Sequence, residues 1–138
     1  LDAQAVSWAG AYGLTQLLLE SGRAAGKLLT PPVEVPAAEA LLDPRVNARL
    51  GAALLGSQVR KFGGNLGLAL GAYNAGDDTA LVWWKRHAGA PFDVFAEEIT
   101  IKETRGYVKR VLTTFGIYRW LYAGATPTLP IEETLPAR

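Results

Sequence analysis

The chain has 138 residues, of which 49% are hydrophobic and 20% charged, and its formal net charge is +1. This length and composition predict one globular domain with a buried core. The near-neutral charge excludes nucleic-acid binding that depends on a large basic excess. With no cysteine and only one histidine, His87, the chain has no disulfide, no thiol nucleophile and no site built from several Cys or His ligands.

The two ends of the sequence and its apolar runs bear on targeting. The chain begins at Leu1 and contains no methionine, so we expect a processed or excised piece of a longer protein, in which a signal peptide would not be visible. No apolar run reaches the roughly 18 residues that a membrane-spanning helix needs. We therefore predict no membrane span in this chain.

The N-terminal third predicts one short helix followed by an irregular connection. Apolar residues from Leu14 to Ala25 recur at helical spacing, and Gly26 can close that helix. Three prolines between Thr30 and Pro36 exclude a regular helix there. This connection is expected to cross the surface.

The middle of the chain has strong helix boundaries. Asp43 followed by Pro44 predicts a helix start, with Asp as the N-cap, and Gly63-Gly64 predicts its end. Asn65 can cap the next helix, Leu66–Ala75, which is apolar on nearly every side. A helix without a polar face is typical of the centre of an all-helical domain.

After this apolar helix, one of the two aspartates at 77 and 78 is expected to cap a helix that contains Trp83 and Trp84. Adjacent helical residues point about 100° apart, so one tryptophan should pack inward and the other lie exposed or at a groove. We expect His87 to be a surface or capping residue. Residues from Pro91 to Glu98 predict one or two further helical turns.

Glu103 opens the longest periodic stretch. Apolar steps of four and three predict one continuous helix face formed by Thr104, Val108, Val111, Phe115, Tyr118 and Tyr122, in which we expect Phe115 and Tyr118 to be core residues. Prolines after Gly124 predict an extended or loose tail. Because no run alternates with period two, the predicted fold class is all-α, with five or six helices around Leu66–Ala75. The predicted domain is 1–122 and the extended C-terminal tail is 123–138.

Three groups of polar residues could carry chemistry, although each has an ordinary structural explanation. Tyr73-Asn74-Ala75-Gly76 ends the most buried helix, where an Asn and a Gly commonly serve as a cap. Glu103-Thr104-Arg105 with Tyr107 starts the long helix, where the helix dipole favours a glutamate and Arg105 could pair with Glu98. The third group, made of ordinary turn and surface residues, is Ser7, Gly13 and Gln16.

The order and spacing of these groups are more specific than any one of them. The chain contains Ser7-x5-Gly13-Leu14-x-Gln16, then Asp43-Pro44-x2-Asn47-x3-Gly51, then Ala72-Tyr73-Asn74-Ala75-Gly76, then Glu103-Thr104-Arg105-x-Tyr107-Val108-x2-Val111. This series resembles the catalytic domain of the soluble lytic transglycosylases, from Leu1 to about Tyr118. The resemblance implies a goose-lysozyme-like helical domain with a groove for peptidoglycan glycan strands.

What the resemblance implies about activity is specific. Such enzymes cleave the β-1,4 bond between N-acetylmuramic acid and N-acetylglucosamine and leave a 1,6-anhydro end. They use one catalytic glutamate together with the substrate's own N-acetyl and 6-hydroxyl groups, so the usual pair of carboxylates is not required. No metal or organic cofactor is implied. The implied location is the periplasm or cell envelope.

The resemblance also assigns roles to single residues. Ser7 matches the serine that orients the catalytic acid, and Tyr73 matches the tyrosine whose hydroxyl lies close to that acid. The residues implied to bind the glycan are Gly13, Gln16, Asn74, Gly76, Glu103 and Tyr107.

The sequence departs from the family pattern at four places. The catalytic glutamate is expected nine residues before Ser7, which is three residues ahead of Leu1. We therefore expect this polypeptide to be inactive, or nearly so, and the parent protein to carry the acid. Glu20 and Glu103 are poor substitutes, because the family geometry puts neither over the scissile bond. The other departures from the motifs are Thr15, Leu19 and Thr100.

Two alternatives remain open at this point. The domain could be a catalytically inactive module that binds peptidoglycan or acts as a scaffold. It could also be a plain helical interaction domain whose motif match is accidental, which the ordered match disfavours.

Overall fold

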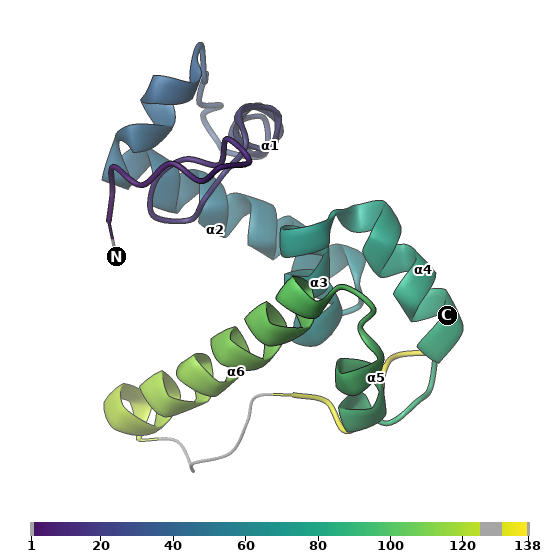
Figure 1. The fold of residues 1–138 in the computed structure, drawn as a ribbon. Coiled ribbons are helices and arrows are strands. Elements are labelled where there is room, and N and C mark those ends of the chain that lie inside the picture. The colour runs from purple at the N-terminus through teal and green to yellow at the C-terminus, as the bar shows by residue number, and fades with distance from the viewer. Residues whose placement is uncertain (1, 125–130, 138) are drawn as a thin grey trace. The chain divides into compact units, whose positions relative to one another are not determined.

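The computed structural model describes residues 2–124 and 131–137. These residues form six α-helices and one 3-10 helix (Figure 1), and their only strand-like pairing consists of three isolated bridges. The predicted all-α class is confirmed. The elements are α1 (Leu19–Gly26), η1 (Ala38–Leu42), α2 (Pro44–Lys61), α3 (Leu66–Ala75), α4 (Asp77–His87), α5 (Phe92–Glu98) and α6 (Lys102–Ala123).

The chain divides into two compact units, Leu1–Ser57 and Gln58–Arg138, and the boundary between them falls within α2. The first unit holds an N-terminal loop, α1, η1 and most of α2. The second holds the last turn of α2 and the helices α3 to α6.

The N-terminal loop replaces the first part of the predicted helix over Leu14–Ala25. Isolated bridges pair Tyr12 with Val6 and with Leu17, and the backbone of Gln16 has a φ of 52°. A right-handed helix cannot continue through such a residue. The helix consequently begins only at Leu19 and ends at the predicted Gly26, while residues 31–36 are irregular as predicted.

The start of α2 follows the local sequence rules. The Asp43 carboxylate accepts hydrogen bonds from the backbone N–H groups of Arg45 (2.8 Å) and Val46 (3.0 Å). These two N–H groups, Val46 first, lower the pKa of Asp43 because they stabilise its ionised form. The predicted N-cap at Asp43 and first helical residue at Pro44 are confirmed.

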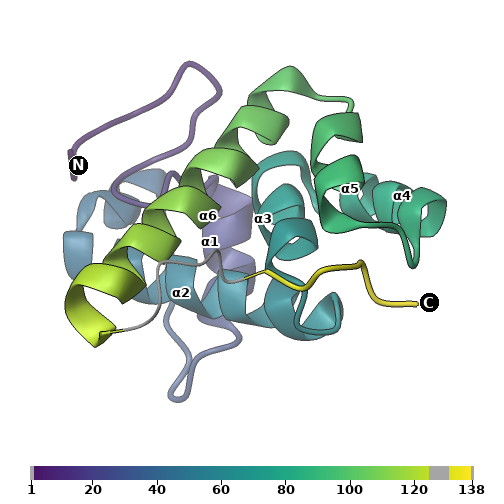
Figure 2. The same cartoon turned by 90° about the horizontal axis from the view of Figure 1, so that it is seen from below.

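Helix α3 is the buried centre of the second unit. Asn65 caps it by accepting a hydrogen bond from the Leu68 N–H (2.9 Å), and six consecutive residues from Gly67 to Ala72 are buried. Helices α4 and α6 pack against α3, and Figure 2 shows the same helices from below. The predicted bounds and cap of Leu66–Ala75 are confirmed, and within the second unit the helix is buried as expected.

The expectation that an aspartate caps the next helix is wrong. Gly76, with φ 89°, precedes α4, and no side chain makes a cap hydrogen bond there. Instead, the Asp77 carboxylate accepts hydrogen bonds from the Gln58 amide (3.1 Å) and the Lys61 ammonium (2.5 Å). Asp77 therefore ties the first turn of α4 to the last turn of α2.

The inward position predicted for one of the two adjacent tryptophans is confirmed, whereas the other is neither exposed nor part of a described groove. Trp83 is buried, and its indole N–H donates to the Thr100 hydroxyl (3.2 Å). Trp84 is half-buried, and its indole N–H donates to the Pro136 carbonyl (2.8 Å). Their different degrees of burial follow from the angle between neighbouring helical residues.

The expected surface position of His87 is wrong. Its ring is 6% exposed and lies 2.9 Å from the Trp83 carbonyl through Nδ1 and 2.7 Å from the Glu98 carboxylate through Nε2. Because Glu98 contacts His87, it does not pair with Arg105. The Arg105 guanidinium donates instead to the Glu97 carbonyl (3.0 Å).

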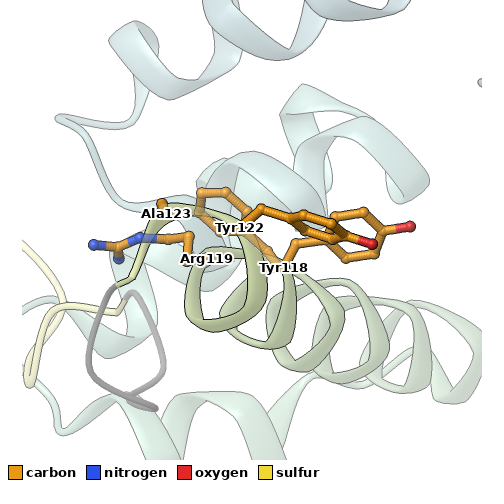
Figure 3. A pocket seen from close by; sticks show the side chains of 5 residues that line it. Tyr118, Arg119, Tyr122 and Ala123 are labelled. Carbon is orange, nitrogen blue, oxygen red and sulfur yellow. The ribbon is translucent and has the colours of Figure 1, made fainter.

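Helix α6 buries Thr104 and Val108 of the predicted face, but its buried face then continues through Leu112 and Gly116. Its buried residues recur every four positions, at Thr104, Val108, Leu112 and Gly116, whereas Phe115 and Tyr118 are 44% and 59% exposed. The expectation that these two rings belong to the core is therefore wrong. The exposed rings line an open depression of about 480 Å³ (Figure 3) formed by Phe115, Tyr118, Arg119, Tyr122 and Ala123.

The described part of the predicted C-terminal tail is extended and pairs with the segment before α5. Thr134 forms a bridge with Pro91, and the Leu135 N–H donates to the Ala90 carbonyl (2.9 Å). Leu135 is only 1% exposed. Figure 1 shows this segment in yellow beside α5. Residues 125–130 of the predicted tail lie outside the described residues.

Candidate functional site

The eight residues singled out in the sequence fall into two groups, one in each unit. The first unit holds Ser7, Gly13 and Gln16. The second holds Tyr73, Asn74, Gly76, Glu103 and Tyr107. Each group is built up separately from its own contacts.

Ser7 closes the turn of residues 7–11. Its hydroxyl oxygen accepts a hydrogen bond from the Ala11 N–H (3.0 Å), and its own N–H donates to the Ala11 carbonyl (2.9 Å). Among the described residues, none accepts the Ser7 hydroxyl hydrogen. Since a hydroxyl can donate while it accepts, a rigidly held Ser7 can still offer a donor to another group.

Gly13 and Gln16 form a tight loop. Gly13 is buried with φ 74°, and its N–H donates to the Ala5 carbonyl (2.8 Å). The exposed Gln16 side chain folds back, so that its Nε2 donates to the carbonyls of Gly13 (2.8 Å) and Ala5 (3.3 Å). The Gln16 amide oxygen has no donor among residues 2–124 and 131–137, and it can accept a hydrogen bond from a ligand.

Asn47 holds this loop in place, and the sequence analysis gave it no role. Asn47 is fully buried in α2. Its Oδ1 accepts hydrogen bonds from the N–H (2.8 Å) and hydroxyl (2.7 Å) of Thr15, and its Nδ2 donates to the carbonyls of Tyr12 (2.9 Å) and Leu41 (2.8 Å). The signal that could have revealed it is an asparagine among apolar residues on the buried face of a helix.

In the second unit, the end of α3 and the first turn of α6 meet through side chains. The Thr104 hydroxyl donates to the Asn74 amide oxygen over 2.5 Å, and Thr104 is 1% exposed. Tyr73 precedes Asn74, and Tyr107 lies one helical turn beyond Thr104. We call Tyr73, Asn74, Thr104 and Tyr107 the α3–α6 cluster.

The phenol of Tyr107 is held in its neutral form. Burial raises the pKa of Tyr107 to about 12, with a smaller contribution from Tyr73, because a phenolate would lose its hydration there. At neutral pH Tyr107 is therefore a hydrogen-bond donor and acceptor. The α3–α6 cluster thus combines uncharged phenol, amide and hydroxyl groups, which suits recognition of an uncharged polar ligand such as a sugar.

Glu103 and Gly76 lie next to this cluster in sequence. The Glu103 side chain is exposed and makes no hydrogen bond or ion pair with any described residue. Gly76 is exposed and provides the chain reversal between α3 and α4. Glu20, considered as a substitute acid, is also exposed and forms an ion pair with Arg23 (2.9 Å). Neither carboxylate is buried.

The pKa of Tyr107 predicts a loss of stability in alkali. An unfolded tyrosine ionises near pH 10, whereas the folded Tyr107 ionises near 12, so the stabilisation is complete below the first value and is lost as the pH rises toward the second. Between about pH 9 and about pH 11.5, the free energy of unfolding of Tyr107→Phe should fall less than that of the wild type, as measured by urea unfolding. Tyr122→Phe, at an exposed position, is the control and should behave as the wild type. If the free energy of unfolding fell equally in Tyr107→Phe and Tyr122→Phe over this pH range, the raised pKa of Tyr107 would be contradicted.

The described residues contain neither a metal-binding group nor a helix suited to a membrane. No three His, Asp or Glu side chains within the described ranges come together as a group that could hold a metal ion. No helix in the described part of the chain has the length and apolar character to cross a membrane.

Comparison with known proteins agrees with this fold and with the order of these motifs. A family model described as the transglycosylase SLT domain matches residues 1–95. The soluble lytic murein transglycosylase of Escherichia coli K12 is 36% identical over 121 residues, which are 87% of this chain and 18% of that protein. The solved 70 kDa soluble lytic transglycosylase of Escherichia coli is similar with a TM-score of 0.86 and 34% identity, over 99% of this chain and 22% of that one.

A second solved structure supports the same relationship. It is the lytic transglycosylase Slt of Pseudomonas aeruginosa in an inactive glutamate-to-glutamine form. The match has a TM-score of 0.85 and 34% identity, and it covers 98% of this chain and 22% of the Pseudomonas aeruginosa chain. The fold is therefore the lysozyme-like catalytic fold of soluble lytic transglycosylases. The chain belongs to the transglycosylase SLT domain family, and it spans about a fifth of the length of these relatives.

Proposed function

We propose that this chain is the catalytic domain of a lytic transglycosylase that cleaves peptidoglycan glycan strands in the cell envelope without hydrolysis. The observation that carries the proposal is the α3–α6 cluster in a chain of this family. A buried apolar helix ends in a phenol and an amide, and a second helix adds a hydroxyl and an uncharged phenol beside them. Polar groups on rigid elements are typical of ligand sites.

The proposed reaction is an internal transfer within the glycan. A glutamic acid donates its proton to the oxygen that leaves from C1 of N-acetylmuramic acid, and the N-acetyl oxygen of that sugar stabilises the positive charge that develops at C1. The 6-hydroxyl oxygen then bonds to C1 and returns its proton to the glutamate. Because no water is consumed, the product carries a 1,6-anhydro ring.

The residue roles follow the family match. We place the general acid on a glutamate upstream of Leu1 in the parent protein. Ser7 would orient this acid through its hydroxyl, and Tyr73 would place its phenol close to it. Residues proposed to support or contact the glycan are Gly13, Gln16, Asn74, Gly76, Glu103 and Tyr107.

A second candidate function applies to the chain on its own. The buried polar residues in the described ranges include no aspartate or glutamate, and a general acid needs such burial to keep its proton near neutral pH. This observation favours a glycan-binding module without catalysis. The parent protein and the 138-residue chain are therefore expected to differ in activity.

The test incubates both proteins with purified sacculi. Mass spectrometry should detect anhydro-muropeptides with the parent protein, whereas the 138-residue chain should co-sediment with sacculi and release none. A parent variant with the upstream glutamate changed to glutamine is the matched control. Co-sedimentation of the parent without product would favour the binding module, and neither binding nor product would overturn both candidates.

Tyr73→Phe in the active parent should lower kcat by about tenfold or more while the fold is retained, because it removes one positioned hydroxyl and keeps the ring. The rate of anhydro-muropeptide release measures the effect, and circular dichroism checks the fold. Tyr118→Phe, on an exposed part of α6, should keep the wild-type rate. An unchanged rate for Tyr73→Phe would remove its assigned role.

A further inference from the structure

Thr104 is the member of the α3–α6 cluster for which the proposed function supplies no role. It lies in the first turn of α6 and is 1% exposed. Its hydroxyl donates to the Asn74 amide oxygen over 2.5 Å, and this is the only side-chain hydrogen bond of Thr104 within the described residues. A buried hydroxyl destabilises a protein unless it is hydrogen-bonded, so the Thr104–Asn74 contact accounts for a polar residue at this position.

The hydrogen bond determines which way the Asn74 amide faces. A carboxamide is planar, with its acceptor oxygen and its NH₂ donors on opposite sides of one carbon. With the oxygen held against Thr104, the NH₂ group points away from that contact. Asn74 is exposed, and no described residue accepts a hydrogen bond from its Nδ2. Two N–H donors are thus presented to solvent in a fixed orientation.

A pair of oriented amide donors recognises acceptor oxygens. We propose that Thr104 is a positioning residue that aims the Asn74 amide at an acceptor oxygen of the glycan, either an acetamido carbonyl or a ring hydroxyl. The inference rests on the proposed function, because the glycan is the ligand there. Without the Thr104 hydroxyl, the amide can rotate and present its oxygen instead, which repels the same acceptor.

The experiment uses the ¹⁵N-labelled full chain and two neutral probes, an N-acetylglucosamine tetramer and cellotetraose. The variants are Thr104→Val, which removes the hydroxyl at similar volume, Thr104→Ser, which keeps it, Asn74→Ala and the Thr104→Val/Asn74→Ala double variant. NMR reports the Asn74 side-chain NH₂ signals without ligand, and titration gives Kd for each probe.

The expected pattern has three parts. Thr104→Val shifts or broadens the Asn74 NH₂ signals without ligand, whereas Thr104→Ser leaves them near their wild-type positions. Thr104→Val and Asn74→Ala each raise Kd for the N-acetylglucosamine tetramer by about fivefold to tenfold, as expected for one hydrogen bond. Thr104→Ser, which keeps the hydroxyl, binds this probe with a Kd near that of the wild type. The double variant is no weaker than Asn74→Ala alone, because Thr104 acts through Asn74. Weakening for both probes identifies a hydroxyl acceptor, and weakening for the acetamido probe alone identifies the carbonyl.

The outcomes separate this inference from the proposed function. The positioning role is overturned if the Asn74 NH₂ signals are unchanged in Thr104→Val, or if the double variant weakens binding by the sum of the two single effects. In either case, glycan binding by the wild-type chain leaves the proposed function intact. A wild-type chain that binds neither probe overturns the glycan as the ligand of Asn74 and counts against the proposed function as well.

Discussion

Asn47→Ala should lower the free energy of unfolding by about 3 kcal/mol or more, because it removes four hydrogen bonds of one fully buried side chain. The Asn47 side chain makes four hydrogen bonds inside the first unit, to Thr15, Tyr12 and Leu41, and it is 0% exposed. Each buried group left unsatisfied costs about 1–3 kcal/mol.

Urea unfolding measures the effect, with Arg49→Ala as the matched control on an exposed position of the same helix. The control should change stability by no more than about 0.5 kcal/mol. Asn47→Asp tests the donors separately, since it keeps an acceptor for Thr15 and turns an oxygen toward the carbonyls of Tyr12 and Leu41. It should be strongly destabilising near neutral pH. Equal stabilities for Asn47→Ala and Arg49→Ala would show that the hydrogen bonds contribute nothing net.

The helix boundaries that the sequence predicted correctly depend on neighbours in the chain. Asp43 and Asn65 cap α2 and α3 through backbone N–H groups two or three residues away, so local rules are sufficient there. The bounds of α3 are also local, since Asn65 starts it and Gly76 ends it. Boundaries of this kind can be predicted without knowledge of the tertiary structure.

The predictions that failed depend on distant contacts. The helix expected from Leu14 is absent because Asn47, 32 residues away, holds the Thr15 backbone in a turn. His87 is buried because Glu98 and Phe95 from α5 cover it, with ring centroids of His87 and Phe95 5.8 Å apart. In α6, apolar residues occupy more than one face, and spacing alone does not determine which face packs against α3. Phe115 and Tyr118 were assigned to the wrong face for this reason.

The candidate site shows the same division. Tyr73, Asn74 and Tyr107 could be selected because they stand in motifs whose order is specific. Thr104 and Asn47 stand in the same motifs, yet their roles depend on which side chains they touch across α3–α6 and across the N-terminal loop. A motif therefore identifies candidate residues, whereas the geometry shows which of them are held by hydrogen bonds to other parts of the chain.

Gly13→Ala should destabilise the protein by about 3 kcal/mol or more, since both its backbone conformation and its surroundings exclude a side chain. Its φ is 74°, and an added Cβ would lie 2.4 Å from the Leu41 carbonyl oxygen and 2.5 Å from the Asn47 Nδ2. Gly10→Ala is a matched control, because Gly10 has φ 75° and nothing within 4 Å of an added Cβ. The control should lose only about 1–2 kcal/mol, the cost of the left-handed backbone.

The difference between the two variants, measured by urea unfolding, isolates the close approach of the loop to Asn47. A larger loss for Gly13→Ala indicates that the added methyl displaces Leu41 or Asn47 and breaks the hydrogen bonds that hold the loop. Gln16 folds its amide onto the Gly13 carbonyl, so the same variant should also disturb the Gln16 side-chain NH₂ signals in NMR spectra, whereas Gly10→Ala should not. Equal losses and unchanged Gln16 signals would mean that the φ angle alone requires glycine at position 13.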